Sequence, residues 1–339
     1  MALAAEITAP ARFADVAARL KAMQSDDLAA TNDVILEHLA SDISLIPQVA
    51  SHLIAAGGKR LRPLICLAAA DICGARGQKP RFLAGAVELI HAATLLHDDV
   101  VDDSALRRGL KTANIVFGNK ESVLVGDFLF ARAFALMVKT ESLDVLDILS
   151  RASCTIAEGE VLQLTTEAEL ETSRATYISV VSAKTAALFE ASARAGAMVA
   201  GAGAKEAEAL GRFGLNFGIA YQLVDDTLDY EGQADNIGKS AGDDFREGKM
   251  TLPVIHAIAR ARDDDERAFW HRTISELDQK VGDFERAQSL IARDGLIEVC
   301  LAEARDYAAA AADALSAVRD TPLRRTLEDL ALSSAARQS

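Results

Sequence analysis

The feature that most limits how this chain can fold is the absence of proline between Pro80 and Pro253. Proline interrupts a helix because its ring clashes with the preceding turn and because it has no backbone N–H to donate. A proline-free run of this length, rich in Ala, Leu and Glu, favours long helices. No sustained alternation of apolar and polar residues supports strands. The sequence therefore predicts an all-α fold built as a bundle of long helices.

An acidic cluster follows an apolar stretch in residues 91–109, which read HAATLLHDDVVDDSALRRG. The helical spacing before the cluster places Asp98 and Asp102, four residues apart, on one face of a helix. Like charges at this spacing repel, so the arrangement favours a cation between them. Mg²⁺ fits, because it takes oxygen ligands and often binds one or two carboxylates together with substrate phosphates. For one such motif alone, a solvated acidic helix face is the alternative.

The same DDxxD spacing returns in residues 221–230, YQLVDDTLDY, again after an apolar helical run. The second cluster comprises Asp225, Asp226 and Asp229. Two acidic clusters, each at the end of a stretch apolar enough to be buried, are poorly explained as solvated surface. We expect two facing acidic helices to hold a group of Mg²⁺ ions between them, and those ions to hold a diphosphate.

Basic residues gather in two other segments. Lys59, Arg60 and Arg62 lie where an apolar helix begins, and backbone amides at a helix N-terminus together with cations favour an anion. Ordinary surface bases beside a helix cap are the alternative there. The polar, glycine-rich residues 232–248, with Lys249 just beyond them, are either a solvated loop or a lid whose lysines close over a metal-bound diphosphate.

Composition excludes several classes of protein. Nothing resembling a linker divides the 339 residues, so we expect residues 28–339 to form one helical domain after an N-terminal extension or short helix at residues 1–27. The net charge of −14 argues against a nucleic-acid partner. No secretory signal or apolar run of membrane-spanning length is recognised, and the four cysteines fit no zinc spacing, so a cytoplasmic protein is expected.

Short motifs between residues 50 and 255 follow an order typical of one family. They are GGKRLRP, the first acidic cluster with its RRG, VGD, GEVLQL, KTA, YQLVDDTLDY and GKSAGDDFREGKMTLP. In these motifs the chain resembles the trans-isoprenyl diphosphate synthases, and within them the long-chain, octaprenyl- or decaprenyl-like branch. The resemblance implies the isoprenoid synthase fold, in which the helices of a single domain surround a central cavity. It also implies a homodimer.

The reaction that the resemblance implies is a prenyl transfer. An allylic diphosphate, farnesyl or geranyl diphosphate, would ionise, and isopentenyl diphosphate would attack the allylic cation to give a product five carbons longer. Mg²⁺, with three ions in each active site, would stabilise the departing diphosphate. The product would serve a quinone side chain and leave through transient contact with a membrane.

The resemblance also assigns residues to the ligands, position by position. The metal ions would bind Asp98, Asp99, Asp102, Asp225, Asp226 and Asp229. Isopentenyl diphosphate would bind Lys59, Arg62, His91 and Arg108, although a hydrogen-bonded core histidine is the alternative for His91. The allylic diphosphate would contact Arg107, Lys184, Thr185, Gln222, Lys239 and Lys249, of which Lys184, Thr185, Gln222 and Lys239 would be catalytic.

Product length is predicted from the helix that carries Asp98. Thr94 and Ala93 precede that residue by four and five positions, about one helical turn deeper. In short-chain members of the family a bulky ring often blocks this level. A small pair leaves a tunnel open, so the resemblance and the helix geometry together predict a product of about C40 to C50.

Three other functions compete with this prediction. A class I terpene cyclase also uses DDxxD and Mg²⁺, but it has a different second metal motif and no need of GGKRLRP. A helical nucleotide phosphohydrolase would use acidic pairs, but it needs neither a long apolar tunnel nor the lysines of the KT and GK motifs. A non-catalytic subunit of a heteromeric synthase usually lacks one acidic motif, whereas this chain has both.

Overall fold

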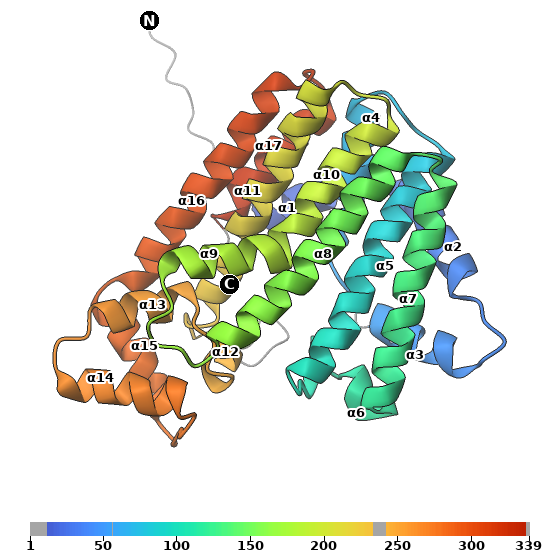
Figure 1. Cartoon of the computed structure of the whole chain (residues 1–339). Helices are drawn as coiled ribbons and strands as arrows, with labels where there is room; N and C mark the ends of the chain where they lie inside the picture. Colours follow the sequence, from blue (N-terminus) through green and yellow to red (C-terminus); the bar gives the residue numbers. More distant parts are fainter. Residues whose placement is uncertain (1–11, 56, 233–241, 337–339) are drawn as a thin grey trace, which may run out of the picture.

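The computed structural model describes residues 12–55, 57–232 and 242–336. These residues are almost entirely helical, which confirms the predicted all-α fold (Figure 1). The strands among them are β1 (Leu106–Arg107) and β2 (Leu110–Lys111), which pair as a short antiparallel hairpin. In chain order the helices are α1 (Phe13–Met23), α2 (Ser25–Leu39), α3 (Leu45–Ala55), α4 (Leu61–Ile72), α5 (Gln78–Val101), α6 (Ala113–Phe117), α7 (Asn119–Lys139), α8 (Leu143–Thr166), α9 (Arg174–Val181), α10 (Ala187–Val199), α11 (Ala204–Leu228), α12 (Asp243–Arg246), α13 (Leu252–Ala259), α14 (Asp264–Trp270), α15 (Asp283–Arg293), α16 (Leu296–Ala314) and α17 (Pro322–Ser334).

Helix α11 lies between two apolar cores and belongs to both. Its first half contributes Phe213 and Phe217 to a core shared with α1 to α5, α7, α8 and α10. Its second half contributes Leu223 and Leu228 to a core shared with α9 and α13 to α16. In Figure 1 the long helices of the first core run side by side, and α13, α14 and α15 gather at one end. The acidic end of α11 therefore lies in the half of the helix that packs into the second core.

Small residues let the helices around the KT motif approach closely. Between α9 and α10 the helix widens into one turn of π-helix, Ser182–Ala186, which carries Lys184. A Cβ on Gly159 of α8 would lie 2.6 Å from the Cβ of Ala183, and a Cβ on Gly218 of α11 would lie 2.6 Å from the Cα of Ala186. Since real Cβ atoms do not come so close, both positions need glycine. Helices α8 and α11 thus both pack closely against the π-helical turn.

The N-terminal part of the described chain packs against the rest of the molecule. Helix α1 buries Phe13, Val16 and Leu20, and it contacts α17, α4 and α2. None of the helices in the described ranges is both long and apolar enough to cross a lipid bilayer.

Candidate active site

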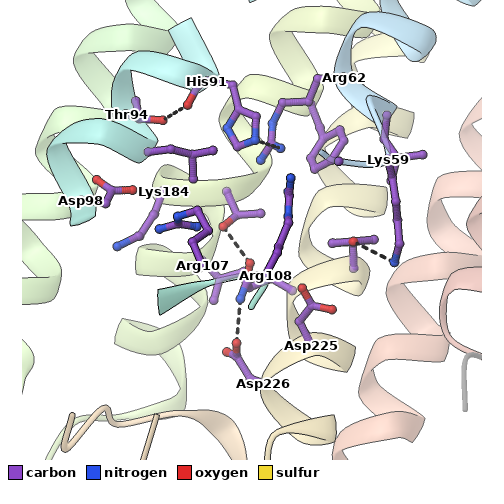
Figure 2. A pocket seen from close by; sticks show the side chains of 18 of the residues that line it. Lys59, Arg62, His91, Thr94, Asp98, Arg107, Arg108, Lys184, Asp225 and Asp226 are labelled. Carbon is purple, nitrogen blue, oxygen red and sulfur yellow. Dashed lines mark hydrogen bonds between the residues drawn. The ribbon is translucent and has the colours of Figure 1, made fainter. Parts of the chain in front are cut away.

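A cavity of about 1370 Å³ lies among α5, α8, the π-helical turn, α11 and the hairpin (Figure 2). Most of the predicted site residues line it: Lys59, Arg62, His91, Thr94, Asp98, Asp102, Arg107, Arg108, Lys184, Thr185, Gln222, Asp225, Asp226, Asp229 and Lys249. Asp99 and Ala93 are described but do not line it. Lys239 lies outside the described residues. Segments distant in the sequence therefore meet at one cavity, which has an acidic wall and a cationic wall.

Asp98 and Asp102 lie at the C-terminal end of α5, on the face predicted from their spacing. Burial raises the pKa of Asp98 to about 7, and the carboxylates of Glu160 and Asp102 add to the shift against the opposing charge of Lys184. Asp102 lies 3.6 Å from the Nζ of Lys249. Burial disfavours the charged form of Lys249, but the carboxylates of Asp244, Asp102 and Glu247 outweigh it and raise the pKa of this lysine.

Asp99 does not line the cavity, but it pairs with Arg107. Its side chain is 1% exposed, and its Oδ1 accepts hydrogen bonds from Nη2 of Arg107 at 2.6 Å and Nε at 2.9 Å. The amide nitrogen of Asn114 donates to the backbone oxygen of Asp99 at 3.0 Å. Arg107 itself lines the cavity. Asp99 therefore acts on the site by positioning a cation.

In the second acidic cluster, Asp226 is held by a chain of hydrogen bonds. Thr185 donates to the side-chain oxygen of Gln222 at 3.0 Å, and the side-chain nitrogen of Gln222 donates to Asp226 at 2.6 Å. The hydroxyl of Tyr177 donates to the other oxygen of Asp226 at 2.6 Å. Burial, followed by the charge of Asp244, raises the pKa of Asp226 to about 7. Tyr177 was missed in the sequence, where a tyrosine on an apolar helix cannot be told from an ordinary core residue.

The other two aspartates of this cluster have different surroundings. Asp225 is exposed to the cavity. Asp229 accepts hydrogen bonds from the backbone N–H groups of Gly242 at 3.1 Å and Asp244 at 3.0 Å. Burial, with Asp244 adding to it, raises the pKa of Asp229 to about 7. Asp229 thus ties the segment that leads to Lys249 onto the end of α11.

Lys184 lies beside Asp98, as Figure 2 shows. The Nζ of Lys184 lies 2.7 Å from a carboxylate oxygen of Glu160 on α8. Sequence analysis did not assign a role to Glu160, although it lies in the GEVLQL motif. Glu160 holds the lysine beside the first acidic cluster.

The cationic wall is formed by Arg62, His91, Arg108 and Lys59. Arg62 lies 3.3 Å from the Nε2 of His91, and its guanidinium stacks 4.2 Å from the ring centroid of Phe189. Burial lowers the pKa of Arg62 to about 10. Burial and the charge of Arg62 lower the pKa of His91 well below its usual value, so the imidazole is neutral at pH 7. The buried Nε of Arg62 has no hydrogen-bond partner in the described structure, which leaves a donor for an anion.

Glu88 balances part of this charge and was also missed in the sequence. It pairs with Arg60, which adopts a left-handed conformation (φ 52°) just before α4. Burial raises the pKa of Glu88, while the charges of Arg60, Arg62 and Arg108 oppose that shift. Glu88 lies three residues before His91 on α5, so helical spacing alone places both on one face. The spacing from His91 is the feature of the sequence that could have identified Glu88.

Of the two residues predicted to set product length, one lines the cavity and the other is buried in the first core. Thr94 lines the cavity and donates a hydrogen bond to the backbone oxygen of His91 at 2.9 Å. Ala93 is fully buried in the first core. The apolar part of the cavity wall comes from α2, α3, α5 and α7, through Ile35, Leu39, Ala50, Leu53, Ile54, Leu89, Leu95 and Leu129.

The acidic wall fits a hard divalent cation that substrate helps to bind. Across the described ranges, no three His, Cys, Asp or Glu side chains converge closely enough to form a metal site by themselves. Mg²⁺ needs no such cage, because it keeps several waters and takes phosphate oxygens as ligands. All the donors offered by Asp98, Asp102 and Asp225 are oxygens. The raised pKa of Asp98 shows that the charges of Lys184 and Arg107 only partly offset the cost of burying this carboxylate.

Comparison with known proteins agrees with this geometry. A family model described as polyprenyl synthetase matches residues 43–291. Octaprenyl diphosphate synthase of Escherichia coli K12 is 42% identical over 313 residues, which cover 92% of this chain and 96% of that protein. The crystal structure of a polyprenyl synthase from Caulobacter crescentus CB15, complexed with calcium and isoprenyl diphosphate, matches with a TM-score of 0.92 at 50% identity, covering 95% of this chain and 98% of that one. A decaprenyl diphosphate synthase from Rhodobacter capsulatus matches with a TM-score of 0.90 at 49% identity, covering 94% and 98%.

Proposed function

This chain belongs to the polyprenyl synthetase family and is a trans-polyprenyl diphosphate synthase, and from that premise we propose that it makes octaprenyl to decaprenyl diphosphate with Mg²⁺. It condenses an allylic diphosphate, farnesyl or geranyl diphosphate, with successive isopentenyl diphosphates. The observation that carries the proposal is one cavity in which two acidic clusters face a separate group of cations. One wall suits a metal-bound diphosphate that departs, and the other suits a diphosphate that stays.

The departing diphosphate belongs at the acidic wall. Asp98, Asp102 and Asp225 would hold Mg²⁺, which when bound stabilises the charge that develops on the leaving group. Arg107 and Lys184 line the same part of the cavity and add fixed positive charge. Their carboxylate partners, Asp99 and Glu160, aim both cations before substrate arrives.

Isopentenyl diphosphate belongs at the cationic wall. Arg62, Arg108 and Lys59 would bind its diphosphate, and neutral His91 would donate a hydrogen bond without adding charge. Fixing this diphosphate turns the attack of its double bond into an effectively unimolecular step. The attack forms a C–C bond and leaves a carbocation on the former isopentenyl unit. That cation loses a proton to an oxygen of the departed diphosphate, which gives the longer allylic diphosphate.

The named relatives support a long product, since they include octaprenyl and decaprenyl diphosphate synthases. The apolar side of the cavity gives a growing chain somewhere to lie. Such a product suits a quinone side chain and would leave through transient contact with a membrane. We also propose a homodimer, because adjacent helices α7 and α8 expose apolar side chains: Leu124, Val138, Leu143, Val161 and Leu164.

The test is product analysis with the pure chain, Mg²⁺, isopentenyl diphosphate and farnesyl diphosphate. Mass spectrometry of the dephosphorylated product should find octaprenol to decaprenol. A pentaprenol or shorter product would keep the condensation and contradict the long tunnel. A cyclic hydrocarbon would indicate a terpene cyclase, and a folded chain with no turnover would indicate a non-catalytic subunit.

Two variants examine the predicted level of length control. Thr94→Phe places a ring in the cavity and should shorten the product, because Thr94 lines the wall beside Asp98. Ala93→Phe should shorten it as well if the tunnel opens beside Ala93 when the chain grows. An unchanged product in both variants would refute this placement of the tunnel.

A further inference from the structure

The cationic wall rests on aromatic rings that come from three helices. Arg62 stacks on Phe189 of α10. The Nζ of Lys59 lies 5.2 Å from the ring centroid of Phe13 on α1 and 5.7 Å from that of Tyr221 on α11. The rings of Phe13 and Tyr221 are 6.0 Å apart, and those of Tyr221 and Phe189 are 6.2 Å apart. The two cations thus lie along a single aromatic row.

Phe13 brings the N-terminal helix into the site. It is the first residue of α1, only 5% of it is exposed, and it lines the cavity. The motifs of residues 50–255 leave this helix without a chemical role. Further along α1, Val16 and Leu20 are buried in the first core, so the helix fixes where its first residue lies.

We propose that Phe13 is a positioning residue for isopentenyl diphosphate, which closes an aromatic clamp with Tyr221 and holds the ammonium group of Lys59 where the diphosphate binds. The proposal rests on the proposed role of Lys59 as a ligand of that diphosphate. It makes α1 part of the binding site and gives a reason for α1 to be docked before substrate arrives.

Lys59 needs such a clamp more than Arg62 does. The guanidinium of Arg62 is planar, buried and stacked, and it lies beside His91. Lys59 is exposed and has a flexible stem that loses rotamer entropy when its ammonium is fixed. Its hydrogen bond to the hydroxyl of Tyr221 is long, at 3.5 Å. Two ring faces attract the ammonium without a directed bond, and so restrain it while its N–H groups remain available.

The test compares two substitutions of Phe13, each of which places a large side chain at the buried position. Phe13→Leu keeps a buried apolar side chain and removes the ring face, whereas Phe13→Tyr keeps the ring. Phe13→Leu should raise the KM for isopentenyl diphosphate about two- to fivefold, the range expected when an exposed cation loses one ring. The kcat and the KM for farnesyl diphosphate should change by less than about twofold, and Phe13→Tyr should behave like the unaltered chain.

A double-mutant cycle and a matched control separate the clamp from a purely structural role. In a Lys59→Met chain, which itself binds isopentenyl diphosphate more weakly, Phe13→Leu should have no further effect on KM. Leu20→Val removes a methylene group from the same helix, and it should lower the melting temperature without changing KM. The clamp is refuted if Phe13→Leu leaves KM unchanged, if it raises KM equally in the Lys59→Met chain, or if Leu20→Val raises KM as much. An unaltered chain that performs no condensation would instead overturn the proposed function.

Discussion

The acidic and cationic walls of the cavity differ in how far the protein itself balances their charges. Burial raises the pKa of Asp98 and of Asp226 to about 7, and for Asp98 the opposing charges of Lys184 and Arg107 do not cancel that shift. Beside the cationic wall, Glu88 pairs with Arg60, and its carboxylate also offsets part of the charge of Arg62 and Arg108. The difference suggests that the cationic wall is complete before substrate arrives, whereas the acidic wall is completed by a metal ion from solution. Four predictions test this difference.

The largest effect is expected when a carboxylate of the acidic wall loses its charge. Asp98→Asn should lower kcat about a thousandfold, the upper range for losing one group that stabilises developing charge. Without metal, the same variant should unfold at a higher temperature, because a buried carboxylate with a raised pKa no longer has to ionise. Steady-state kinetics and thermal unfolding without Mg²⁺ measure the two effects. A loss of activity together with a lower melting temperature without metal would show that the charge of Asp98 stabilises the fold. It would contradict the proposed difference between the two walls.

Substitution of the neighbouring carboxylate, Asp99, should lower the stability of the fold, whereas Asp98→Asn should raise it. Asp99 is 1% exposed and already paired with Arg107, so Asp99→Ala leaves a guanidinium without its partner. Removing one partner of a buried ion pair should lower the free energy of unfolding by about 3 kcal/mol. Denaturant unfolding measures that loss. In the Asp99→Ala/Arg107→Ala double variant the loss should be much smaller than the sum of the two single losses, and strictly additive losses would argue against the pair.

Sequence reasoning found both walls, but it treated each motif as one unit. The spacing of Asp98, Asp102 and Asp225 was enough to place them at the cavity, because helical periodicity fixes the face that a side chain occupies. Periodicity turns Asp99 about 100° away from Asp98, but the family motif assigned both to the metal. The sequence did not show that the hairpin brings Arg107 back to α5 as the partner of Asp99. Tyr177 and Phe13 reach the site only through packing between distant helices, which leaves no local signal.

A smaller effect on activity is expected when the counter-charge of the cationic wall is removed. Glu88→Gln removes the counter-charge of Arg60 and keeps the shape of the side chain. Glu88 also interacts electrostatically with Arg62 and Arg108, so both lose a carboxylate that helps to orient them. The KM for isopentenyl diphosphate should therefore rise about tenfold, the loss expected for one charged hydrogen bond. The kcat should change little, because Glu88 is placed on the wall of the substrate that stays. Titration with isopentenyl diphosphate at saturating farnesyl diphosphate checks this. A fall in kcat with an unchanged KM would assign Glu88 to the acidic wall instead.

The smallest expected effect concerns pH. A carboxylate whose pKa rises from 3.8 in the unfolded chain to about 7 in the fold, as for Asp98, stabilises the fold below pH 3.8 relative to higher pH. That contribution falls as the pH rises above 3.8 and is lost once the pH has passed about 7. Mg²⁺ binds the ionised form, so Mg²⁺ alone should raise the melting temperature more at pH 8 than at pH 6, by about 2 °C.

The same experiment with Asp98→Asn isolates the acidic wall. The difference between pH 8 and pH 6 should become smaller, because this side chain then carries no titratable proton, while Asp226 and Asp229, whose pKa values are also raised to about 7, keep theirs. Glu88→Gln should leave the difference in place, since Glu88 pairs with Arg60 and is not among the residues placed to hold Mg²⁺. If Glu88→Gln removed the pH dependence and Asp98→Asn kept it, the uncompensated charge would lie on the cationic wall, and the assignment of the two diphosphates would have to be exchanged.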